Sequence, residues 1–529
     1  MVSVLERFRP RNLIKRTLQH LDRQRLLSSG LFDPEWYLTE YPDVRTSGMD
    51  PAVHYLTYGG AEGRDPSPTF DTDWYYWRNP EVRQARINAL IHFLRTRGGC
   101  DWHWDTSAGR APNVKKKHRC SSPLNIVFVN HGSFNNNSAG HIAGIANALA
   151  ERGHNVLVCA RGDPQAITEF GIPYFAMLSR GALMSNPGLL REVFTNNFDH
   201  VPTLLHCWTA RENVRTAAAA AIKKLNIPYF VHLEDNDDLI RRMELDRARA
   251  VISCAYAQDC QGSPSFLYDP LRARSFVSEA AGATIIVDAL RQLVPSHISV
   301  HVLEPGLDSA LLAASQLDRS DRPRLCHMFN IPADACIVPY TGNVHRTNAK
   351  EMLDFYEAVQ VLNRRGLNVH LVRTGSNHCP ELDDRFEELS QKHVTDLGLV
   401  DRLTLFQVFR LGDIFVQPGA PGEFNDYRLP SKLPDFLASG RPVILPATNV
   451  GLHLRDGVDC LLLYRGDAME IADRVAAVIR DKELAARLAS NARQFAIRNF
   501  SWEMSATRLE EFYLATLANS SETRFIRQQ

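Results

Sequence analysis

The sequence predicts an α/β protein in which two domains with parallel sheets follow a small, mainly helical module. From residue 124, an apolar run, a glycine-containing polar loop, an amphipathic stretch and a second apolar run follow one another. The same order returns from residue 335. Such strand–loop–helix–strand spacing is that of a βαβ unit. A duplicated segment precedes both domains, with residues 31–44 recurring as residues 69–82.

Length and composition agree with several soluble domains. A chain of 529 residues is too long for one core, and 44% hydrophobic with 23% charged residues is typical of globular proteins. The formal net charge of +0 excludes a general attraction to nucleic acid, so we expect any anion to be bound locally. The ten cysteines are scattered without a CxxC pair, which favours reduced thiols over a disulfide framework or zinc site. No apolar run approaches a membrane span and no signal-peptide core is present, so we expect a cytoplasmic protein.

We divide the chain into six segments. They are a basic amphipathic segment (1–29), a duplicated helical module (30–104), a linker (105–121), an N-terminal Rossmann-like domain (122–315), a C-terminal Rossmann-like domain (325–500) and a terminal helix with tail (501–529).

The basic N-terminal segment has two interpretations. Ile14, Leu18 and Leu21 share one helical face, with basic residues largely elsewhere. This pattern indicates either a helix lying on the inner face of the plasma membrane or a solvated helix packed on its own protein.

The duplicated module has matching residues at a constant offset of 38 positions, as from Phe32 to Phe70. The pattern predicts in each copy an Asp-capped helix, a proline-containing turn and a second helix. The matching Trp, Tyr and His residues form either the shared core of two stacked helical hairpins or a surface for carbohydrate or a partner.

The most informative segment is Phe424–Pro446, where a basic, proline-bounded loop leads into a short helix and then an apolar strand. Arg428, Ser431 and Lys432 lie in the loop, and Asp435 lies one turn inside the helix. A loop that enters a helix N-terminus offers free backbone N–H groups, and the cations add charge, which favours phosphate. Asp435 is placed to accept hydrogen bonds from sugar hydroxyls. The segment therefore predicts a nucleotide-diphosphate site; the alternative is an ordinary loop–helix–strand without ligand.

This segment resembles the C-terminal signature of the retaining glycosyltransferases of family four, which have the GT-B fold of two facing Rossmann-like domains. That family places a carboxylate five residues before the glycine of a Gly-x-Pro-Val stretch, matched here by Asp435, Gly440, Pro442 and Val443. A glutamate usually stands eight residues before that carboxylate, but this chain has Tyr427 there.

The resemblance, which extends over roughly residues 122–517, implies roles for individual residues. The family has a Gly-Arg after the first strand of this domain and a lysine about two turns later, both gripping the diphosphate. Gly342 matches, Asn343 replaces the arginine, and Arg346 and Lys350 are the nearest bases, although Lys350 also fits a solvated helix residue. The implied catalytic residues are Arg428, Lys432, Glu234 and His232. The implied donor-binding residues are Asp435, Ser431, Tyr427, Arg346, Lys350, Gly342, Gly375, Gly132 and Gly140, the last two in a loop under the transferred sugar.

The sequence therefore favours a hexosyl or deoxyhexosyl transferase that moves a sugar, with retention, from a nucleotide-diphosphate donor to a glycan or lipid-linked acceptor. The resemblance implies no metal or cofactor, and bacterial cell-surface polysaccharide synthesis as the setting. Three alternatives stay open: a metal-dependent transferase using Asp235 and Asp237, a GT-B epimerase or phosphorylase, and a catalytically degenerate scaffold. The altered Tyr427 and Asn343 favour the scaffold.

Overall fold

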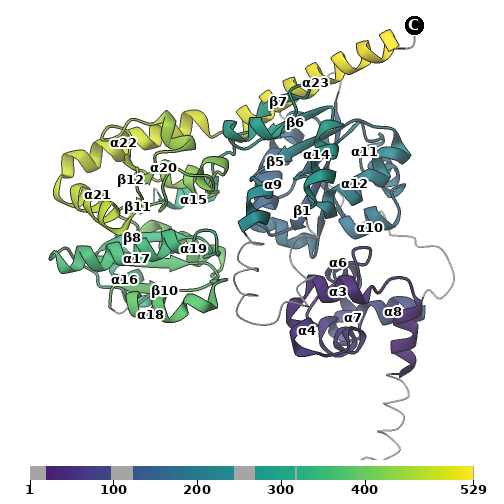
Figure 1. Cartoon of the computed structure of the whole chain (residues 1–529), viewed down its shortest axis with the longest axis horizontal. Helices are drawn as coiled ribbons and strands as arrows, with labels where there is room; N and C mark the ends of the chain where they lie inside the picture. The colour runs from purple at the N-terminus through teal and green to yellow at the C-terminus, as the bar shows by residue number, and fades with distance from the viewer. Residues whose placement is uncertain (1–19, 97–122, 244–267, 316–318, 391, 528–529) are drawn as a thin grey trace, which may run out of the picture. The chain divides into compact units, whose positions relative to one another are not determined.

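The computed structural model describes residues 20–96, 123–243, 268–315, 319–390 and 392–527 (Figure 1). The chain divides into two compact units: residues 1–232 with 244–283, and residues 233–243 with 284–529.

The helical module consists of two copies of one three-helix unit. The copies are α3 (Pro34–Glu40), α4 (Pro42–Ser47) and α5 (Pro51–His54) with the π-turn η2 (Tyr55–Gly59), then α6 (Thr72–Arg78), α7 (Pro80–Gln84) and α8 (Ala89–Thr96). Asp33 accepts a hydrogen bond from Trp36 N (3.0 Å), and its counterpart Asp71 accepts one from Trp74 N (2.9 Å). The repeat and its aspartate cap are therefore confirmed. The expected proline-containing turn is wrong, because Pro42 and Pro80 each begin a further short helix, α4 and α7.

The aromatic residues shared by the two copies form the core of the module. Tyr37 is fully buried, and its hydroxyl hydrogen-bonds His54 Nδ1 at 3.0 Å. The counterparts Tyr75 and His92 make the same bond at 2.8 Å. Of the two interpretations of these residues, the shared core is the one that this packing supports.

The described end of the basic segment belongs to this module. Residues 20–28 are helical, and Leu26 is fully buried in the module core. Arg23 pairs with Asp50 at 2.7 Å. Ile14, Leu18 and the bases before residue 20 lie outside the described residues, so the membrane-surface helix stays a prediction.

The first α/β domain is built on a seven-stranded sheet in the order β3-β2-β1-β4-β5-β6-β7. The strands are β1 (Asn125–Ser133), β2 (Asn155–Arg161), β3 (Ala176–Ser179), β4 (Leu204–Trp208), β5 (Tyr229–Leu233), β6 (Gly282–Ile285) and β7 (Ser299–Val302). Strands β3 to β5 are parallel to their neighbours. Strand order reverses between β1 and β4, which is the place where open α/β sheets bind ligands.

Helices and 3₁₀ turns flank this sheet. They are α9 (Asn137–Glu151), η3 (Pro164–Phe170), α10 (Arg180–Ser185), α11 (Leu189–Phe198), α12 (Glu212–Leu225), α14 (Pro270–Ser278) and η5 (Asp288–Leu293). Gly140 was expected in the loop after β1, and this placement is wrong: it lies inside α9, where an added Cβ would come within 2.9 Å of the Phe170 ring. This glycine permits close packing of α9.

The second α/β domain has two three-stranded sheets, β10-β9-β8 and β11-β12-β13. Their strands are β8 (Cys336–Thr341), β9 (Val369–Thr374), β10 (Val394–Asp396), β11 (Phe415–Val416), β12 (Val443–Pro446) and β13 (Leu461–Leu463), with parallel pairing. Asp413 N donates to Ile337 O (2.8 Å) and thus joins β11 to β8. Strand order therefore reverses at β8.

Helices and 3₁₀ turns also flank the sheets of this domain. They are α15 (Ser309–Ser315), α16 (Arg322–Met328), α17 (Ala349–Arg364), η6 (Pro380–Leu382), α18 (Asp383–Ser390), α19 (Arg402–Leu411), η7 (Asn425–Tyr427), α20 (Leu433–Ala438), η8 (Asn449–His453), α21 (Ala468–Arg480), α22 (Lys482–Asn499) and α23 (Trp502–Arg527). The predicted apolar stripe of α17, from Met352 to Leu362, is fully buried in the core of the domain. The terminal helix α23 packs on the end of the first sheet, where Ser505 Oγ donates to Glu304 O (2.8 Å).

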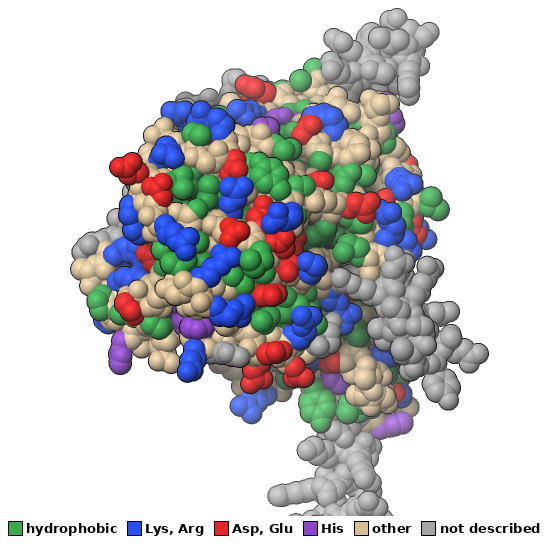
Figure 2. All heavy atoms as spheres, turned by 60° about the vertical axis from the view of Figure 1, so that its left-hand side comes forward, with side chains coloured by type: hydrophobic (Ala, Val, Ile, Leu, Met, Phe, Trp, Pro, Cys, Tyr) green, Lys and Arg blue, Asp and Glu red, His purple; other side chains and the backbone are tan. Residues whose placement is uncertain are grey.

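Surface and cysteine chemistry agree with the composition. Positive and negative side chains intermingle on the face in Figure 2, so an anion site there depends on local groups.

The cysteines of the described residues are free thiols, and Cys159 and Cys207 are fully buried in strands. None of the described helices combines the length and apolarity that a bilayer span needs.

The paired Tyr–His bonds give a first testable prediction. We expect Tyr37→Phe to destabilise the module by about 1–3 kcal/mol, because it leaves the buried His54 ring nitrogen unsatisfied. Tyr75→Phe should cost less, about 0.5–1.5 kcal/mol, since His92 is only half-buried. Hydrogen exchange of helices α3 to α8 in the full chain measures both, with the exposed Tyr58→Phe as control. Equal exchange in all three variants contradicts the prediction.

Candidate functional site

Two glycine loops meet at the carboxyl edge of the second domain, where strand order reverses. Gly342 follows β8, and its N–H donates to Thr374 O (3.0 Å) at the end of β9. Gly375 has φ +106°, and a Cβ there would lie 2.6 Å from the carbonyl carbon of Gly342. Only glycine permits both this conformation and this approach. The structure thus brings the predicted Gly342 and Gly375 into contact.

Lys432 holds its positive charge against this edge. Its Nζ lies 3.8 Å from the centroid of the Tyr340 ring and next to Gly342. Among the described residues, no hydrogen-bond acceptor or carboxylate pairs with this ammonium group. A half-buried cation without a counter-ion, on the edge where α/β sheets bind ligands, favours an anionic ligand.

Arg428 is fixed beside it by three contacts. Its Nε donates to Asn425 Oδ1 (3.0 Å), its Nη2 donates to Glu351 Oε2 (3.1 Å), and its guanidinium carbon lies 4.0 Å from the Phe424 ring centroid. Its side chain is 17% exposed, so it is not turned into open water. Nη1 makes no hydrogen bond within the described parts of the chain and stays available to a ligand.

The electrostatics of the neighbouring groups agree with a positive local field. Burial raises the pKa of Glu351, and the charges of Arg428 and Lys432 oppose that rise. Burial lowers the pKa of His345, and the positive charges of His378, Lys432 and Arg428 lower it further. The ring of His345 stacks on that of His378 at 4.8 Å.

Polar contacts hold the loop before α20 in one conformation. Asn449 Nδ2 donates to the carbonyl oxygens of Asn425 (2.6 Å) and Arg428 (2.8 Å). Thr448 Oγ1 donates to Asp426 Oδ1 at 2.5 Å. Sequence reasoning missed Glu351, Asn425 and Asn449. Glu351 had a usable signal, because a carboxylate in the first turn of the helix after a glycine loop lies near that loop.

The backbone at α20 differs from the expectation. The sequence predicted free N–H groups at this helix start, but Leu433 N already donates to Pro430 O (2.9 Å) and Pro434 has no N–H. The helix has only six residues, so its dipole is small. The helix start therefore offers fewer free amides than expected, since those of Leu433 and Pro434 are lost to a ligand, and the cationic side chains supply much of the attraction.

Asp435 lies one turn inside α20, as predicted, and is partly buried. Its Oδ1 accepts a hydrogen bond from Asp308 N (3.0 Å), and the Asp308 carboxylate pairs with Arg402. Burial raises the pKa of Asp435 to about 7. Oδ2 forms no hydrogen bond to a described residue, so one oxygen anchors the chain at Asp308 and the other is open to a ligand hydroxyl.

The remaining candidates of this domain lie in different surroundings. Tyr427 Oη accepts a hydrogen bond from Gln292 Nε2 at 2.5 Å. Ser431 and Arg346 are exposed. Lys350 is 86% exposed and pairs with Asp354 one turn along α17 at 2.6 Å, so we leave it out of the phosphate site.

The candidates of the first domain lie at strand ends. Gly132 was expected in the loop after β1, but it belongs to the end of the strand itself. His232 is buried in β5, its ring 4.0 Å from that of Trp208, and Glu234 follows the same strand. Within the described residues, Asp235 and Asp237 are part of no group of three or more His, Cys, Asp or Glu that holds a metal ion.

Comparison with known proteins agrees with this layout. Residues 335–481 match the family model described as "Glycosyl transferases group 1", and no curated protein sequence matches the chain. Among solved structures, the Anabaena protein HepE in complex with UDP and glucose is similar (TM-score 0.53, 17% identity, covering 74% of this chain and 100% of that one). A glycosyltransferase from Rickettsia africae is similar too, with a TM-score of 0.55 and 15% identity, covering 75% of this chain and 100% of that one. Sucrose-phosphate synthase from Thermosynechococcus elongatus has a TM-score of 0.53 and 15% identity, with the same coverage of 75% and 100%.

These likenesses show that the chain has the GT-B fold, which the sequence predicted, and residues 335–481 match the group 1 glycosyl transferase model.

The raised pKa of Asp435 gives a second testable prediction. A carboxyl whose folded pKa lies above its unfolded value of 3.8 loses its stabilising contribution as the pH rises from about 4 to about 7. One pKa unit corresponds to about 1.4 kcal/mol. We expect thermal stability to fall over this range more steeply in the native chain than in Asp435→Asn, which keeps the bond from Asp308 N. Parallel pH profiles of the melting temperature would contradict this.

Proposed function

We propose that the protein is a glycosyltransferase that uses a nucleoside-diphosphate sugar as donor. The observation that carries this proposal is the position of Lys432 against Gly342, with Arg428 paired to Glu351 in the helix after that loop, inside the segment that matches the group 1 transferases. The solved complex of HepE with UDP and glucose supports UDP as the first nucleotide to test.

In this mechanism, the two cations stabilise the leaving diphosphate. Cleavage of the sugar–diphosphate bond gives an oxocarbenium-like sugar, and negative charge grows on the phosphate oxygens. Lys432 supplies an ammonium group and Arg428 its free Nη1, both held in place before the reaction. Preorganised donors of this kind each lower the barrier by about 2.7–4 kcal/mol. Glu351 acts by orienting Arg428.

Asp435 Oδ2 then accepts hydrogen bonds from the nucleotide ribose, and Tyr427 lies on the side of the transferred sugar. We propose retention of configuration, a hexosyl or deoxyhexosyl donor, and a glycan or lipid-linked acceptor in bacterial surface polysaccharide synthesis. The free buried thiols support a cytoplasmic location, with any contact to the inner membrane face made by the segment before residue 20.

A second candidate function is a binding scaffold without turnover. The two residues that depart from the family pattern are both engaged within the protein. Asn343 Oδ1 accepts a hydrogen bond from Ser376 N (2.8 Å), and Tyr427 is bonded to Gln292. Groups held in this way contribute to folding whether or not a sugar is transferred.

A third prediction tests the phosphate-binding cations. We expect Lys432→Ala and Arg428→Ala each to reduce donor turnover by about 10²–10³-fold, because each removes a preorganised donor to the leaving group. Turnover is measured as nucleoside diphosphate released from UDP-glucose, GDP-mannose and dTDP-rhamnose. The control is Lys350→Ala, which removes an exposed base from the same region and should leave turnover unchanged. Unchanged turnover in both site variants would refute the assignment.

A fourth prediction separates the transferase from the scaffold. Nucleotide at a hundred times its dissociation constant stabilises a protein by about 2.7 kcal/mol. We expect UDP, GDP or dTDP to raise the melting temperature of the native chain, and the rise to disappear in Lys432→Ala. If none of the three nucleotides shifts the native melting temperature, the donor site is wrong and the scaffold is favoured.

A further inference from the structure

Two side chains of the first domain converge on one carbonyl oxygen where its strand order reverses. Arg180 Nη1 donates to His131 O (2.5 Å) and to Asn130 O (2.7 Å). Asn213 Nδ2 donates to the same His131 oxygen (2.8 Å). His131 lies at the end of β1, and Asn213 lies in α12 directly after β4. These groups thus occupy the carboxyl edge between β1 and β4, where open α/β sheets bind ligands.

This cluster has unused hydrogen-bonding capacity. Asn213 Oδ1 is buried and has no hydrogen-bond partner among the described residues. Arg180 is 8% exposed, and no carboxylate within the described parts of the chain forms an ion pair with it. Burial and the charge of Arg161 lower the pKa of Arg180 to about 10. Buried polar groups are normally satisfied, so an open acceptor beside a partly used guanidinium indicates a polar ligand.

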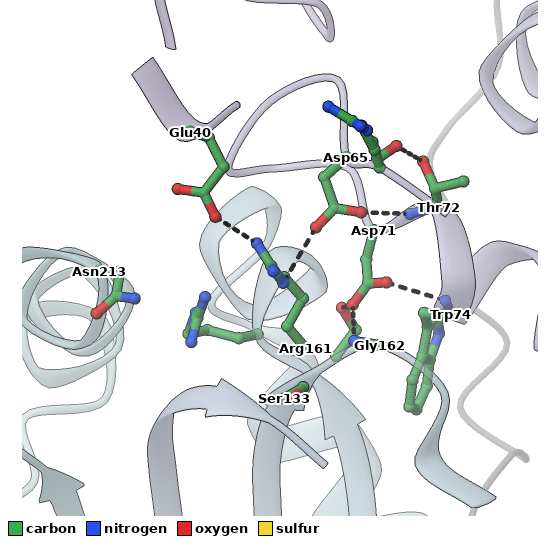
Figure 3. Close-up of polar contacts among 12 residues, drawn as sticks. Glu40, Asp65, Asp71, Thr72, Trp74, Ser133, Arg161, Gly162 and Asn213 are labelled. Atoms are coloured by element: carbon green, nitrogen blue, oxygen red, sulfur yellow. Dashed lines mark hydrogen bonds and ion pairs between the residues drawn. The ribbon is translucent and has the colours of Figure 1, made fainter. Parts of the chain in front are cut away.

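The helical module reaches the same edge through Arg161. In Figure 3, Arg161 points from the end of β2 toward the module, between Glu40 and Asp65. Its Nη1 lies 2.7 Å from Glu40 and its Nε 3.6 Å from Asp65. On the other side, Asp71 Oδ2 accepts hydrogen bonds from Gly162 N (3.0 Å) and Ser179 Oγ (2.9 Å). The module is therefore bonded to the carboxyl ends of β2 and β3.

The aspartate cap and the tryptophan of the second repeat bond or pack against the first domain, whereas their counterparts in the first repeat do not. Asp71 is 2% exposed and both caps α6 and bonds the sheet, whereas its counterpart Asp33 is exposed and only caps α3. Trp74 is 3% exposed and stacks on Phe134 of the loop after β1. Its counterpart Trp36 is half-buried within the module. Breaking such buried polar bonds is costly, so the module is held as part of this domain.

We propose that Arg180 and Asn213 form an acceptor-binding site and that the helical module, through the Arg161–Glu40 pair, forms its wall. The ligand class is a hydroxyl-rich glycan. The cluster offers both donors and an acceptor. The carboxylates of Asp71, Asp65 and Glu40 act on Arg180 electrostatically although none pairs with it, so hydroxyl groups fit the cluster better than phosphate. The proposal rests on the proposed transferase function, for which it supplies the acceptor side, and it makes the module part of acceptor recognition.

The test measures glycan binding without nucleotide, so that it is independent of the donor site. The full chain is mixed with maltotriose, cellotriose, laminaritriose or chitotriose, and hydrogen exchange of residues 131–136 and 209–213 is recorded. At about 10 mM, an oligosaccharide of millimolar affinity slows exchange roughly tenfold. We expect at least one of the four to protect the native chain, and the protection to disappear in Asn213→Ala and in Glu40→Ala.

Asp33→Ala is the matched control, because it removes the equivalent helix cap from the repeat that does not touch the sheet. Protection retained in this variant supports the proposal. The proposal is overturned if none of the four oligosaccharides protects the native chain, if protection survives in Asn213→Ala and Glu40→Ala, or if Asp33→Ala abolishes it too. Melting temperatures with and without UDP are recorded for every variant. A UDP shift without glycan protection refutes this inference alone, whereas glycan protection without any nucleotide shift refutes the proposed donor site alone.

Discussion

The proposed donor site depends on one constraint, which is that a positive charge without an ion-pair partner is kept at the carboxyl edge of the second α/β domain. Lys432 satisfies this constraint by lying on the Tyr340 ring and against Gly342, where no side chain intervenes. The face of an aromatic ring attracts a cation without cancelling its charge. Gly375 has to be a glycine so that the two loops can approach. The cation is thereby positioned before any ligand arrives, which is the condition for electrostatic stabilisation of a leaving group.

Arg428 in the second domain and Arg161 at the helical module are both arginines that carboxylates hold in a fixed orientation. Arg428 is oriented by Glu351 and Asn425, yet one guanidinium nitrogen stays available. Arg161 is held by Glu40 and Asp65, and these bonds attach the module to the first sheet (Figure 3). In both places a carboxylate near a cation serves orientation. The helical repeats thus contribute to the environment of the strand ends.

Much of the fold was predictable because it depends on local periodicity. The stripe of α17, the duplicated Asp caps and the helix–strand order after Arg428 all follow from spacing along the chain. The wrong predictions concern positions whose role is set by contacts with residues distant in the sequence. Gly140 was expected in a loop, but it lies in α9, where the Phe170 ring packs against it and leaves no room for a side chain. The amides at the start of α20 were expected to be free, but Leu433 N donates to Pro430 O and Pro434 has no N–H.

By itself, the sequence determined the α/β class, the repeat and the presence of Arg428, Lys432 and Asp435 in one short segment, because hydrophobic period and motif spacing are properties of neighbouring residues. Only the tertiary structure decided which charges are paired. Glu351 and Asn449 meet Arg428 from positions 77 and 21 residues away, and Asp308 meets Asp435 across more than a hundred residues. Hydrogen bonds act over a few ångströms in space, so the partners of a charged group are set by how the strands and helices pack.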